Sequence, residues 1–343
     1  MASSDNTRPK IIVTGGAGFI GSHTAVSLVN AGFEPIIVDN FSNSEHKILA
    51  GLKQILGRAL THYEADCNDA SEMERIFATE QPMGIIHFAA SKAVGESVEK
   101  PLMYYRNNLN SLMVLLELMP RHNVRSFVFS SSCTVYGQPE QLPVTEATPR
   151  LPASSPYGNT KAMGEDIIRD CVASKMPIRA ISLRYFNPIG AHPSALIGEL
   201  PRGVPANLVP YLLQVATKQR ASLTVHGNDY STPDGTAIRD YIHVMDLAEA
   251  HVSALQLLGQ KDADSFYDIF NIGTGRGASV LDLINTFEEV TGITLPYTLG
   301  PRRAGDIEQI YADVIKATEG LNWQTKRSLA EALGDAWRWQ QTL

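Results

Sequence analysis

The chain has 343 residues, of which 44% are hydrophobic and 19% charged, and this composition excludes global disorder. Its 29 Lys and Arg residues against 36 Asp and Glu residues give a net charge of −7, which excludes the basic footprint of a nucleic-acid-binding protein.

No stretch approaches the roughly 18 consecutive apolar residues of a membrane span. Met1–Lys10 lack the apolar core of a signal peptide. The three cysteines are too scattered for a disulfide framework or zinc site. We therefore expect a cytoplasmic protein that binds no nucleic acid, membrane or metal.

Short β-branched runs alternate with longer helical patterns over the first 185 residues. The runs are continuously apolar, which is typical of parallel strands covered on both faces. A helix over about 18–30 follows the first run. This alternation predicts an α/β fold with a Rossmann-type doubly wound parallel sheet. The predicted strands contain Ile11–Val13, Ile36–Val38, Ile85–Phe88, Phe127–Phe129 and Ala180–Leu183.

A glycine-rich turn follows the first strand and opens the first helix. Gly15, Gly16, Gly18 and Gly21 lie in this turn, where missing Cβ atoms allow close approach of a pyrophosphate to the helix N-terminus. Asp39 ends the second strand, 18 residues beyond Gly21, and no Lys or Arg follows in residues 40–44. This pattern predicts NAD rather than NADP as cofactor. The alternative is that the glycines only tighten a turn and Asp39 is a solvated strand end.

Three later segments carry further expectations. A helix over Tyr104–Met119 is apolar beyond a single stripe, so it is either a central helix buried in the monomer or part of a subunit interface. Residues 138–156 contain five of the 19 prolines and are expected to form a lid or binding segment. After Pro188 the pattern becomes irregular, which indicates a smaller substrate-capping unit.

A serine, a tyrosine and a lysine are the candidate catalytic residues. Ser132 follows the strand around Phe127–Phe129, at the edge of the sheet where ligands of open α/β folds bind. Ser155 and Pro156 predict a helix start, which places Tyr157 and Lys161 one turn apart on the same face. A lysine ammonium beside the phenol would stabilise the phenolate and make Tyr157 a base for an alcohol proton. Taken alone, Tyr-x-x-x-Lys is common on surface helices.

Several segments together resemble the extended short-chain dehydrogenase/reductase family, and within it the UDP-hexose 4-epimerases, over nearly the whole chain. The resemblance implies that the NAD-binding Rossmann domain spans 1–186 and that a smaller α/β UDP-sugar-binding domain spans 187–343, with 239–257 packing back on the first. The segments that carry the resemblance are 14–23, 87–100, 130–137, 155–161, 183–192 and 239–246.

The resemblance implies the following site residues. Tyr157, Lys161 and Ser132 would be catalytic. Arg239 and Arg303 would neutralise a diphosphate, although composition alone favours a surface ion pair as the role of each arginine. The residues implied for NAD are Gly15, Gly18, Phe19, Ile20, Gly21, Asp39, Asn40, Phe41, Ser42, Asn43, Ser44, Asp66, Cys67, Phe88, Ala89, Ala90, Lys92, Asn107, Ser132, Tyr157, Lys161 and Phe186. Those implied for the UDP-sugar are Ser132, Tyr157, Asn187, Asn207, Leu208, His226, Arg239, Arg303, Asp306 and Ile310.

The activity that the resemblance implies is reversible interconversion of UDP-galactose and UDP-glucose by a homodimer with tightly bound NAD. His226 stands where the family often has a Phe, and Ile310 where it often has a Tyr or a smaller residue, so acceptance of N-acetylated sugars stays open. One alternative is a nucleotide-sugar 4,6-dehydratase or decarboxylase, but the Asp-Glu pair typical of the dehydratases is replaced by Cys133-Thr134. The other is a non-catalytic NAD-binding regulatory protein, although such proteins typically lose the Tyr or Lys.

The segment around His243 and His251 contains the side chains of a candidate metal site. The offsets of these histidines from Asp246 and Glu249 do not put both imidazoles on one helix face, which disfavours metal binding. Asp246 is interpreted instead as a helix N-cap.

Overall fold

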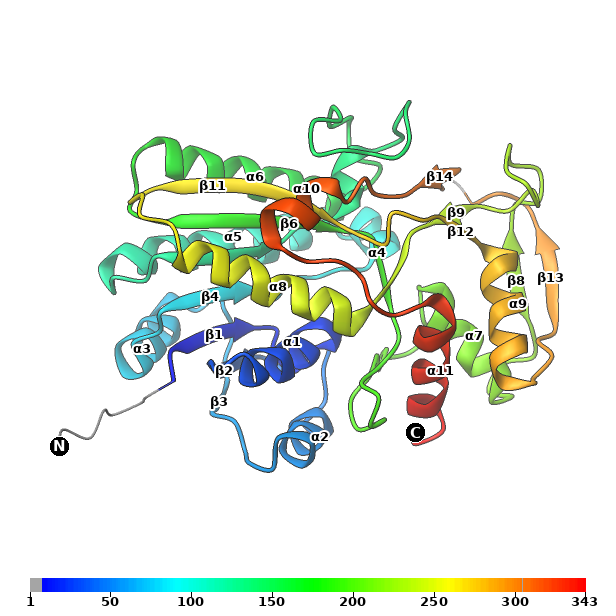
Figure 1. Ribbon diagram of the computed structural model, residues 1–343, viewed down its shortest axis with the longest axis horizontal. Coiled ribbons are helices and arrows are strands. Elements are labelled where there is room, and N and C mark those ends of the chain that lie inside the picture. The colour runs from blue at the N-terminus through cyan, green and yellow to red at the C-terminus, as the bar shows by residue number, and fades with distance from the viewer. Residues whose placement is uncertain (1–7, 304) are drawn as a thin grey trace.

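The computed structural model describes residues 8–303 and 305–343. Its largest element is a seven-stranded parallel sheet in the order β11-β6-β5-β4-β1-β2-β3, which confirms the predicted Rossmann-type fold (Figure 1). The prediction about a signal peptide falls mainly on residues 1–7, outside the described residues. The strands are β1 (Lys10–Thr14), β2 (Glu34–Asp39), β3 (His62–Glu64), β4 (Gly84–His87), β5 (Ser126–Ser130), β6 (Arg179–Tyr185) and β11 (Phe266–Ile272).

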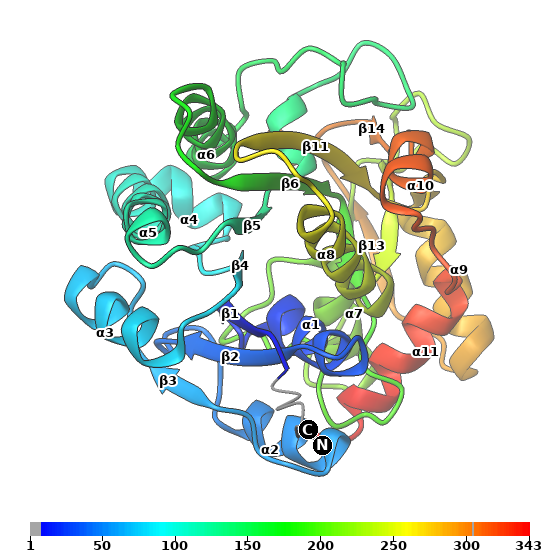
Figure 2. The same cartoon turned by 60° about the vertical axis from the view of Figure 1, so that its left-hand side comes forward.

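Helices cover both faces of this sheet (Figure 2). Ile11 and Val13 pack into the core with α1 and α8, whereas Ile12 between them packs into the core with α3 and α5, because successive side chains of a strand point to opposite faces. Burial on both faces explains the continuous apolar runs in the sequence. One face carries α1 (Phe19–Asn30), α2 (Lys47–Leu56), α8 (Val244–Gly259) and α10 (Ile315–Leu321), and the other α3 (Ala70–Glu80), α5 (Pro101–Arg121) and α6 (Pro156–Ala173). The short helix α4 (Val94–Glu99) lies against α5 and α6.

A smaller region stands beyond the carboxyl ends of the large sheet, and its core is formed by α7, α9 and α11 together with β8 (Figure 1). Its parallel pairs are β10 with β7 and β13 with β8, and a three-stranded sheet has the order β12-β9-β14. The elements are β7 (Asn187–Ile189), α7 (Leu208–Ala216), β8 (Leu223–His226), β9 (Ile238–Arg239), β10 (Tyr241–His243), β12 (Ala278–Ser279), α9 (Val280–Thr291), β13 (Tyr297–Gly300), β14 (Gln309–Ile310) and α11 (Leu329–Gln340).

Residues after 187 therefore contribute to both regions. Helix α8 packs against α1 and β5, and β11 adds the outer parallel strand beside β6. Helix α8 begins at His243, whose Nδ1 accepts the Met245 N–H at 3.0 Å, so the predicted N-cap role of Asp246 is wrong. Asp246 lies inside the first turn and accepts the backbone N–H groups of Lys326 and Arg327 at 3.0 and 2.9 Å.

Residues 138–156, which the sequence predicts as a lid or binding segment, are anchored to the main body. Val144 is fully buried, donates its backbone N–H to Tyr311 at 3.0 Å, and accepts the Asp313 N–H at 2.7 Å. The side chain of Asn271 donates to the Val144 carbonyl as well. The segment therefore supports the strand pair around β14.

Two absences hold for the described parts of the chain. No helix there is long and apolar enough to cross a membrane. No group of three or more His, Cys, Asp or Glu side chains within 8–303 and 305–343 is arranged to hold a metal ion.

We predict that the protein loses stability as the pH falls from about 6.5. Burial lowers the pKa of His23 and His87 to about 3 and that of His243 and His251 to about 4. The unfolded chain binds protons at these histidines at a pH where the folded chain does not, so stability is full above pH 6.5 and falls below it. The midpoint of thermal unfolding should decrease between pH 7.5 and 5.0.

His251→Leu should flatten that dependence, because it removes one of the four titrating groups. Proton uptake on unfolding at pH 5.5, measured in lightly buffered solution, should be smaller for the variant. Equal melting temperatures at pH 7.5 and 5.0 would contradict the prediction.

Candidate active site

The glycine turn after β1 has no room for side chains. Gly15 has φ +65°, and a Cβ atom there would lie 2.9 Å from the Ala89 backbone nitrogen. A Cβ on Gly21 would lie 2.3 Å from the Gly15 carbonyl oxygen. Helix α1 starts at Gly18 without a side-chain cap, so its first N–H groups lack the acceptor that a capping residue would supply. This geometry suits a diphosphate held by backbone N–H groups.

Asp39, at the end of β2, organises the segment that follows it. Its Oδ1 accepts the Phe41 N–H at 2.9 Å and the Ser44 hydroxyl at 2.8 Å. Its Oδ2 accepts the Ala17 N–H at 3.0 Å, which links the carboxylate to the glycine turn. Phe41 has φ +53°, and these hydrogen bonds hold its uncommon left-handed conformation. The carboxylate and the tight turn thus lie together, as a dinucleotide with an unphosphorylated ribose requires, and the residues fit NAD.

Asp66, one of the predicted NAD residues, accepts hydrogen bonds from two side-chain amides. Asn40 donates to Asp66 at 3.2 Å, and Asn68 donates to Asp66 at 2.8 Å and to Asn107 at 2.9 Å. Cys67 is buried, and burial raises the pKa of its thiol to about 12, so it is a small apolar wall residue and not a reactive thiolate. Asn68 is absent from the sequence prediction although it joins two predicted residues.

The remaining predicted NAD residues lie on either side of the turn. Phe19 and Ile20 form the first turn of α1, and Ser42 and Asn43 are exposed beyond Phe41. Phe88, Ala89 and Ala90 follow β4, where the Phe88 N–H donates to the Thr14 carbonyl at 3.1 Å. Phe186 is buried beside Cys133 and Ile310, which places it between the two regions.

Ser132, Tyr157 and Lys161 meet at the carboxyl end of β5. Ser132 caps a short 3₁₀ helix (Cys133–Tyr136), and its Oγ accepts the Thr134 N–H at 3.2 Å. Ser155 caps α6, with Oγ accepting the Gly158 N–H at 3.2 Å, which fixes Tyr157 in the first turn. The Lys161 ammonium nitrogen lies 5.9 Å from the centre of the Tyr157 ring. The four-residue spacing of Tyr157 and Lys161 in the sequence therefore places the two side chains next to each other on α6.

The sequence predicts that the Lys161 ammonium stabilises the Tyr157 phenolate, but burial shifts the pKa of both groups toward their neutral forms. Burial raises the pKa of Tyr157 above its ordinary value, and the Ser132 side chain lowers it only in part. Lys161 is also buried, which lowers its pKa to about 7, and it donates to the Ser130 carbonyl at 2.7 Å. Burial therefore opposes formation of the phenolate, and positive charge next to Tyr157 would stabilise it.

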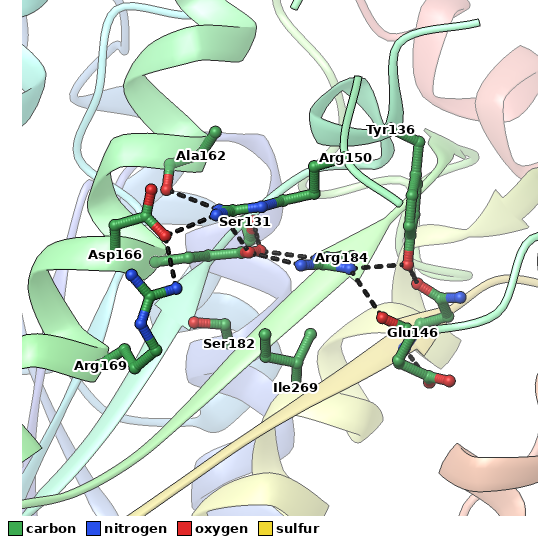
Figure 3. Close-up of polar contacts among 12 residues, drawn as sticks. Ser131, Tyr136, Glu146, Arg150, Ala162, Asp166, Arg169, Ser182, Arg184 and Ile269 are labelled. Carbon is green, nitrogen blue, oxygen red and sulfur yellow. Dashed lines mark hydrogen bonds and ion pairs between the residues drawn. The ribbon is translucent and has the colours of Figure 1, made fainter. Parts of the chain in front are cut away.

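A buried ion pair fixes α6 on the sheet. Glu165, one turn beyond Lys161, accepts Nε and Nη2 of Arg184 at 2.8 and 2.6 Å, and both side chains are at most 4% exposed. Ser131, the neighbour of Ser132, donates its hydroxyl to the same carboxylate at 2.6 Å. Figure 3 shows Arg184 reaching on its other side to the Tyr136 hydroxyl, at 3.0 Å. Glu165 therefore joins α6, which carries Tyr157 and Lys161, both to β6 through Arg184 and to the segment of Ser132 through Ser131.

Arg239 is the centre of the predicted UDP-sugar residues. It lies on β9, paired in register with Ile310 of β14, and its Nη2 is 3.5 Å from an Asp306 carboxylate oxygen. Ile310 is buried in one cluster with Cys133 and Phe186, so it connects β14 to the segment of Ser132.

The other predicted UDP-sugar residues come from several segments of the smaller region. Asn187 starts β7, and its backbone N–H donates to the carbonyl of Asp240, the residue after Arg239. His226 ends β8 beside Gly300 of β13, and Arg303 is exposed in the loop that follows β13.

Two residues that sequence reasoning missed join the regions. The Glu199 carboxylate lies 3.4 Å from the Lys92 ammonium and accepts the Asn207 side-chain amide at 3.2 Å. Arg202 donates to the carbonyls of Ser42 and Ser44, both at 2.7 Å. No local motif marks either residue, because their partners on the NAD side are more than 100 positions away in the chain.

A cavity of about 510 Å³ lies elsewhere, at the outer edge of β11. Its charged lining includes Lys316 and Asp268, which pair with each other at 2.5 Å, and Arg169, which pairs with Asp166 at 2.7 Å. None of the predicted site residues lines it, and we place the active site at the carboxyl ends of the strands instead.

The model of the NAD dependent epimerase/dehydratase family matches residues 11–273. The chain is 51% identical over 333 residues to the UDP-glucose 4-epimerase of Bacillus subtilis, covering 97% of each chain. It is 50% identical over 329 residues to the UDP-glucose 4-epimerase of Neisseria meningitidis, covering 96% of each. The crystal structure of UDP-glucose 4-epimerase from Bifidobacterium longum in complex with NAD+ and UDP superimposes with a TM-score of 0.92, at 45% identity, covering 97% of this chain and 98% of the other.

We predict that Glu165→Gln lowers the unfolding free energy by about 3–5 kcal/mol, because it leaves the buried Arg184 cation without its counter-charge. Asp166→Asn is the matched control on the next position of α6: its pairs with Arg150 and Arg169 are partly exposed, and it should cost at most about 1 kcal/mol. Urea denaturation followed by circular dichroism measures both. Equal losses in the two variants would contradict a special role for the buried pair.

Proposed function

The chain belongs to the NAD dependent epimerase/dehydratase family, and we propose that it interconverts UDP-galactose and UDP-glucose by reversible inversion at C4, with NAD as its tightly bound cofactor. The observation that carries this function is the cluster of Ser132, Tyr157 and Lys161 between a turn that fits NAD and the β9–β14 pair that carries Arg239. The relatives named above are UDP-glucose 4-epimerases over almost their full length.

Tyr157 removes the proton of the C4 hydroxyl, and Ser132 hydrogen-bonds the same oxygen. NAD, when bound, would supply the acceptor for hydride from C4 and the donor of hydride to the opposite face of the sugar, and would bring positive charge near the phenol. Lys161 adds to this charge from the next turn of α6, and its bond to the Ser130 carbonyl orients it. The raised pKa of Tyr157 then suits the return step, in which the phenol gives the proton back.

The chain has to hold the nucleotide firmly and the hexose loosely, because the sugar must present both faces in turn. Arg239 and Arg303 hold the diphosphate in this proposal, with Asn187, Asn207 and Leu208 around the rest of the nucleotide. Arg239 is mostly buried and braced by Asp306, which suits a fixed anchor. His226 stacks on the uracil, and Ile310 and Asp306 border the sugar side.

We propose the same division of labour between the two regions as the sequence predicts: residues 1–186 bind NAD and residues 187–343 bind the UDP-sugar. The strand β11 and the helix α8 belong to residues 187–343 by sequence, but both pack on the large sheet of the first region. The proposal is supported by Asp39 and the glycine turn on one side and by β9 with Arg239 on the other.

The comparisons favour epimerisation over the alternatives. The family model covers both epimerases and dehydratases, whereas the curated relatives and the crystal structure named above are all UDP-glucose 4-epimerases. In the structure, the position after Ser132 holds Cys133, whose pKa burial raises to about 12. A buried neutral thiol cannot replace the carboxylates that elimination of water needs.

We further propose that the protein is a homodimer that works in the cytoplasm. Helix α5 buries one face in the monomer but exposes Leu102, Met103 and Met113, and Val98 of α4 is exposed beside them. Such a group of exposed apolar side chains is typical of a protein–protein interface. The three cysteines are free thiols, which fits a reducing compartment.

We predict that the purified protein carries NAD and converts UDP-galactose to UDP-glucose without added cofactor. Tyr157→Phe should lower kcat by about 10²–10⁴-fold, because it removes the group that moves the proton. The NAD content of the variant, measured after denaturation, should stay at the wild-type level. Product ratios are read by NMR, and UDP-N-acetylgalactosamine run in parallel settles the substrate range. Full activity of Tyr157→Phe would exclude this tyrosine as the base.

Leu102→Glu combined with Met113→Glu should shift the protein from dimer to monomer in light scattering after size exclusion, because the charges disrupt an apolar interface. Ile315→Glu is the control, since Ile315 on α10 is 62% exposed on another helix. A wild-type protein that elutes as a monomer would refute the dimer.

A further inference from the structure

A segment of the smaller region lies across the NAD-binding residues, and we call residues 196–207 the strap. It enters from the core of the large sheet, where Ile197 is buried, and ends at Asn207, the N-cap of α7. A Cβ on Gly51 of α2 would lie 2.2 Å from the Leu196 carbonyl, so the strap touches α2 directly. In Figure 1 this green segment descends beside α2 and α11 before α7 begins.

The strap is fixed at its start by α11. The Trp339 indole N–H donates to the Glu199 carbonyl at 2.8 Å, and a Cβ on Gly198 would lie 2.3 Å from the same indole ring. The first part of the strap therefore cannot move away without repacking α11.

Arg202 is the contact of the strap with the segment after β2. Its Nη1 donates to the Ser42 carbonyl and its Nη2 to the Ser44 carbonyl, both at 2.7 Å. Bonds from a charged donor are stronger than neutral ones, and the planar guanidinium presents its donors as a rigid fork. Asp39 holds the same segment from the inside, through Phe41 and Ser44. Residues 40–44 are thus held between an acid of the NAD-binding region and an arginine of the smaller region.

The strap also reaches the proposed nucleotide site. Glu199 contacts Lys92 on the NAD side and the side-chain amide of Asn207 on the UDP side. Asn207 contacts Glu199, which lies three residues before Arg202 on the strap, and Arg202 contacts residues 40–44. A ligand that moves Asn207 can therefore affect residues 40–44 through the strap.

We propose that Arg202 is a positioning residue that closes the strap over the adenosine end of NAD and retains the cofactor between turnovers. The second part of this proposal, which rests on the proposed function, is that a uridine nucleotide bound near Asn207 tightens the closure. Arg202 touches neither the reacting carbon nor the phenol of Tyr157, so its effect is on NAD release and not on the chemical step.

The test compares NAD release from wild type and from Arg202→Gln. Protein loaded with NAD is diluted into an NAD-scavenging enzyme mixture, and the NAD that stays bound is measured over time. Loss of two charge-assisted hydrogen bonds should speed release on the order of 10-fold or more. Arg202→Lys, which keeps the charge but not the fork, should fall between the two. Arg125→Gln is the control, because this exposed arginine pairs with Asp264 at 2.9 Å and not with residues 40–44.

The pattern of effects separates positioning from general damage. The apparent affinity of Arg202→Gln for NAD should fall, whereas kcat for UDP-galactose should recover in excess NAD. The melting temperature of the NAD-free protein should match that of Arg125→Gln. Equal NAD release rates in wild type and Arg202→Gln would overturn the proposal.

Added UDP tests the second part. UDP should slow NAD release from wild type and have little effect on Arg202→Gln, because the strap then lacks its contact with residues 40–44. An equal effect of UDP on both proteins would overturn this coupling. Calorimetric titration of wild type with UDP keeps the two proposals distinct: failure of UDP to bind would refute the proposed function, while the NAD release rates would still decide the role of Arg202.

Discussion

The buried ion pair between Glu165 and Arg184 is the interaction on which the active site depends. Removing two charges from water is costly, and it is tolerated here because two parallel hydrogen bonds and the Ser131 hydroxyl satisfy the carboxylate. The pair joins α6 to β6 one turn beyond Lys161, so it sets how far Tyr157 stands from the end of β5. A helix held only by apolar packing could rotate or slide by part of a turn, whereas a fork-shaped ion pair fixes its register.

The electrostatics of the catalytic cluster follow from the same burial. Burial raises the pKa of the Tyr157 phenol and lowers that of the Lys161 ammonium to about 7, so both shifts favour the neutral form of the group. Such a pair gains a charged, reactive state when a cation arrives beside it.

The two regions of the protein are connected by polar contacts that span long stretches of chain. The strap brings Arg202 to residues 40–44 and Glu199 to Lys92, while Ile310 packs beside Phe186 and Cys133. These contacts join residues that are far apart in the sequence. A structural change in one region can therefore alter the other. An enzyme that keeps its cofactor while exchanging its sugar nucleotide needs this kind of connection.

The sequence by itself determined the features that depend on neighbours in the chain: the apolar strands, the glycine turn, Asp39 at a strand end, and the helical spacing of Tyr157 and Lys161. Glu165 continues that spacing and could have been found in the same way. Only the tertiary structure decided that β11 joins the large sheet, that Asp246 receives Lys326 and Arg327, and that Arg202 lies on the NAD side. Backbone periodicity and steric limits are local, whereas hydrogen bonds between segments 80 or more residues apart arise only when the whole core has packed.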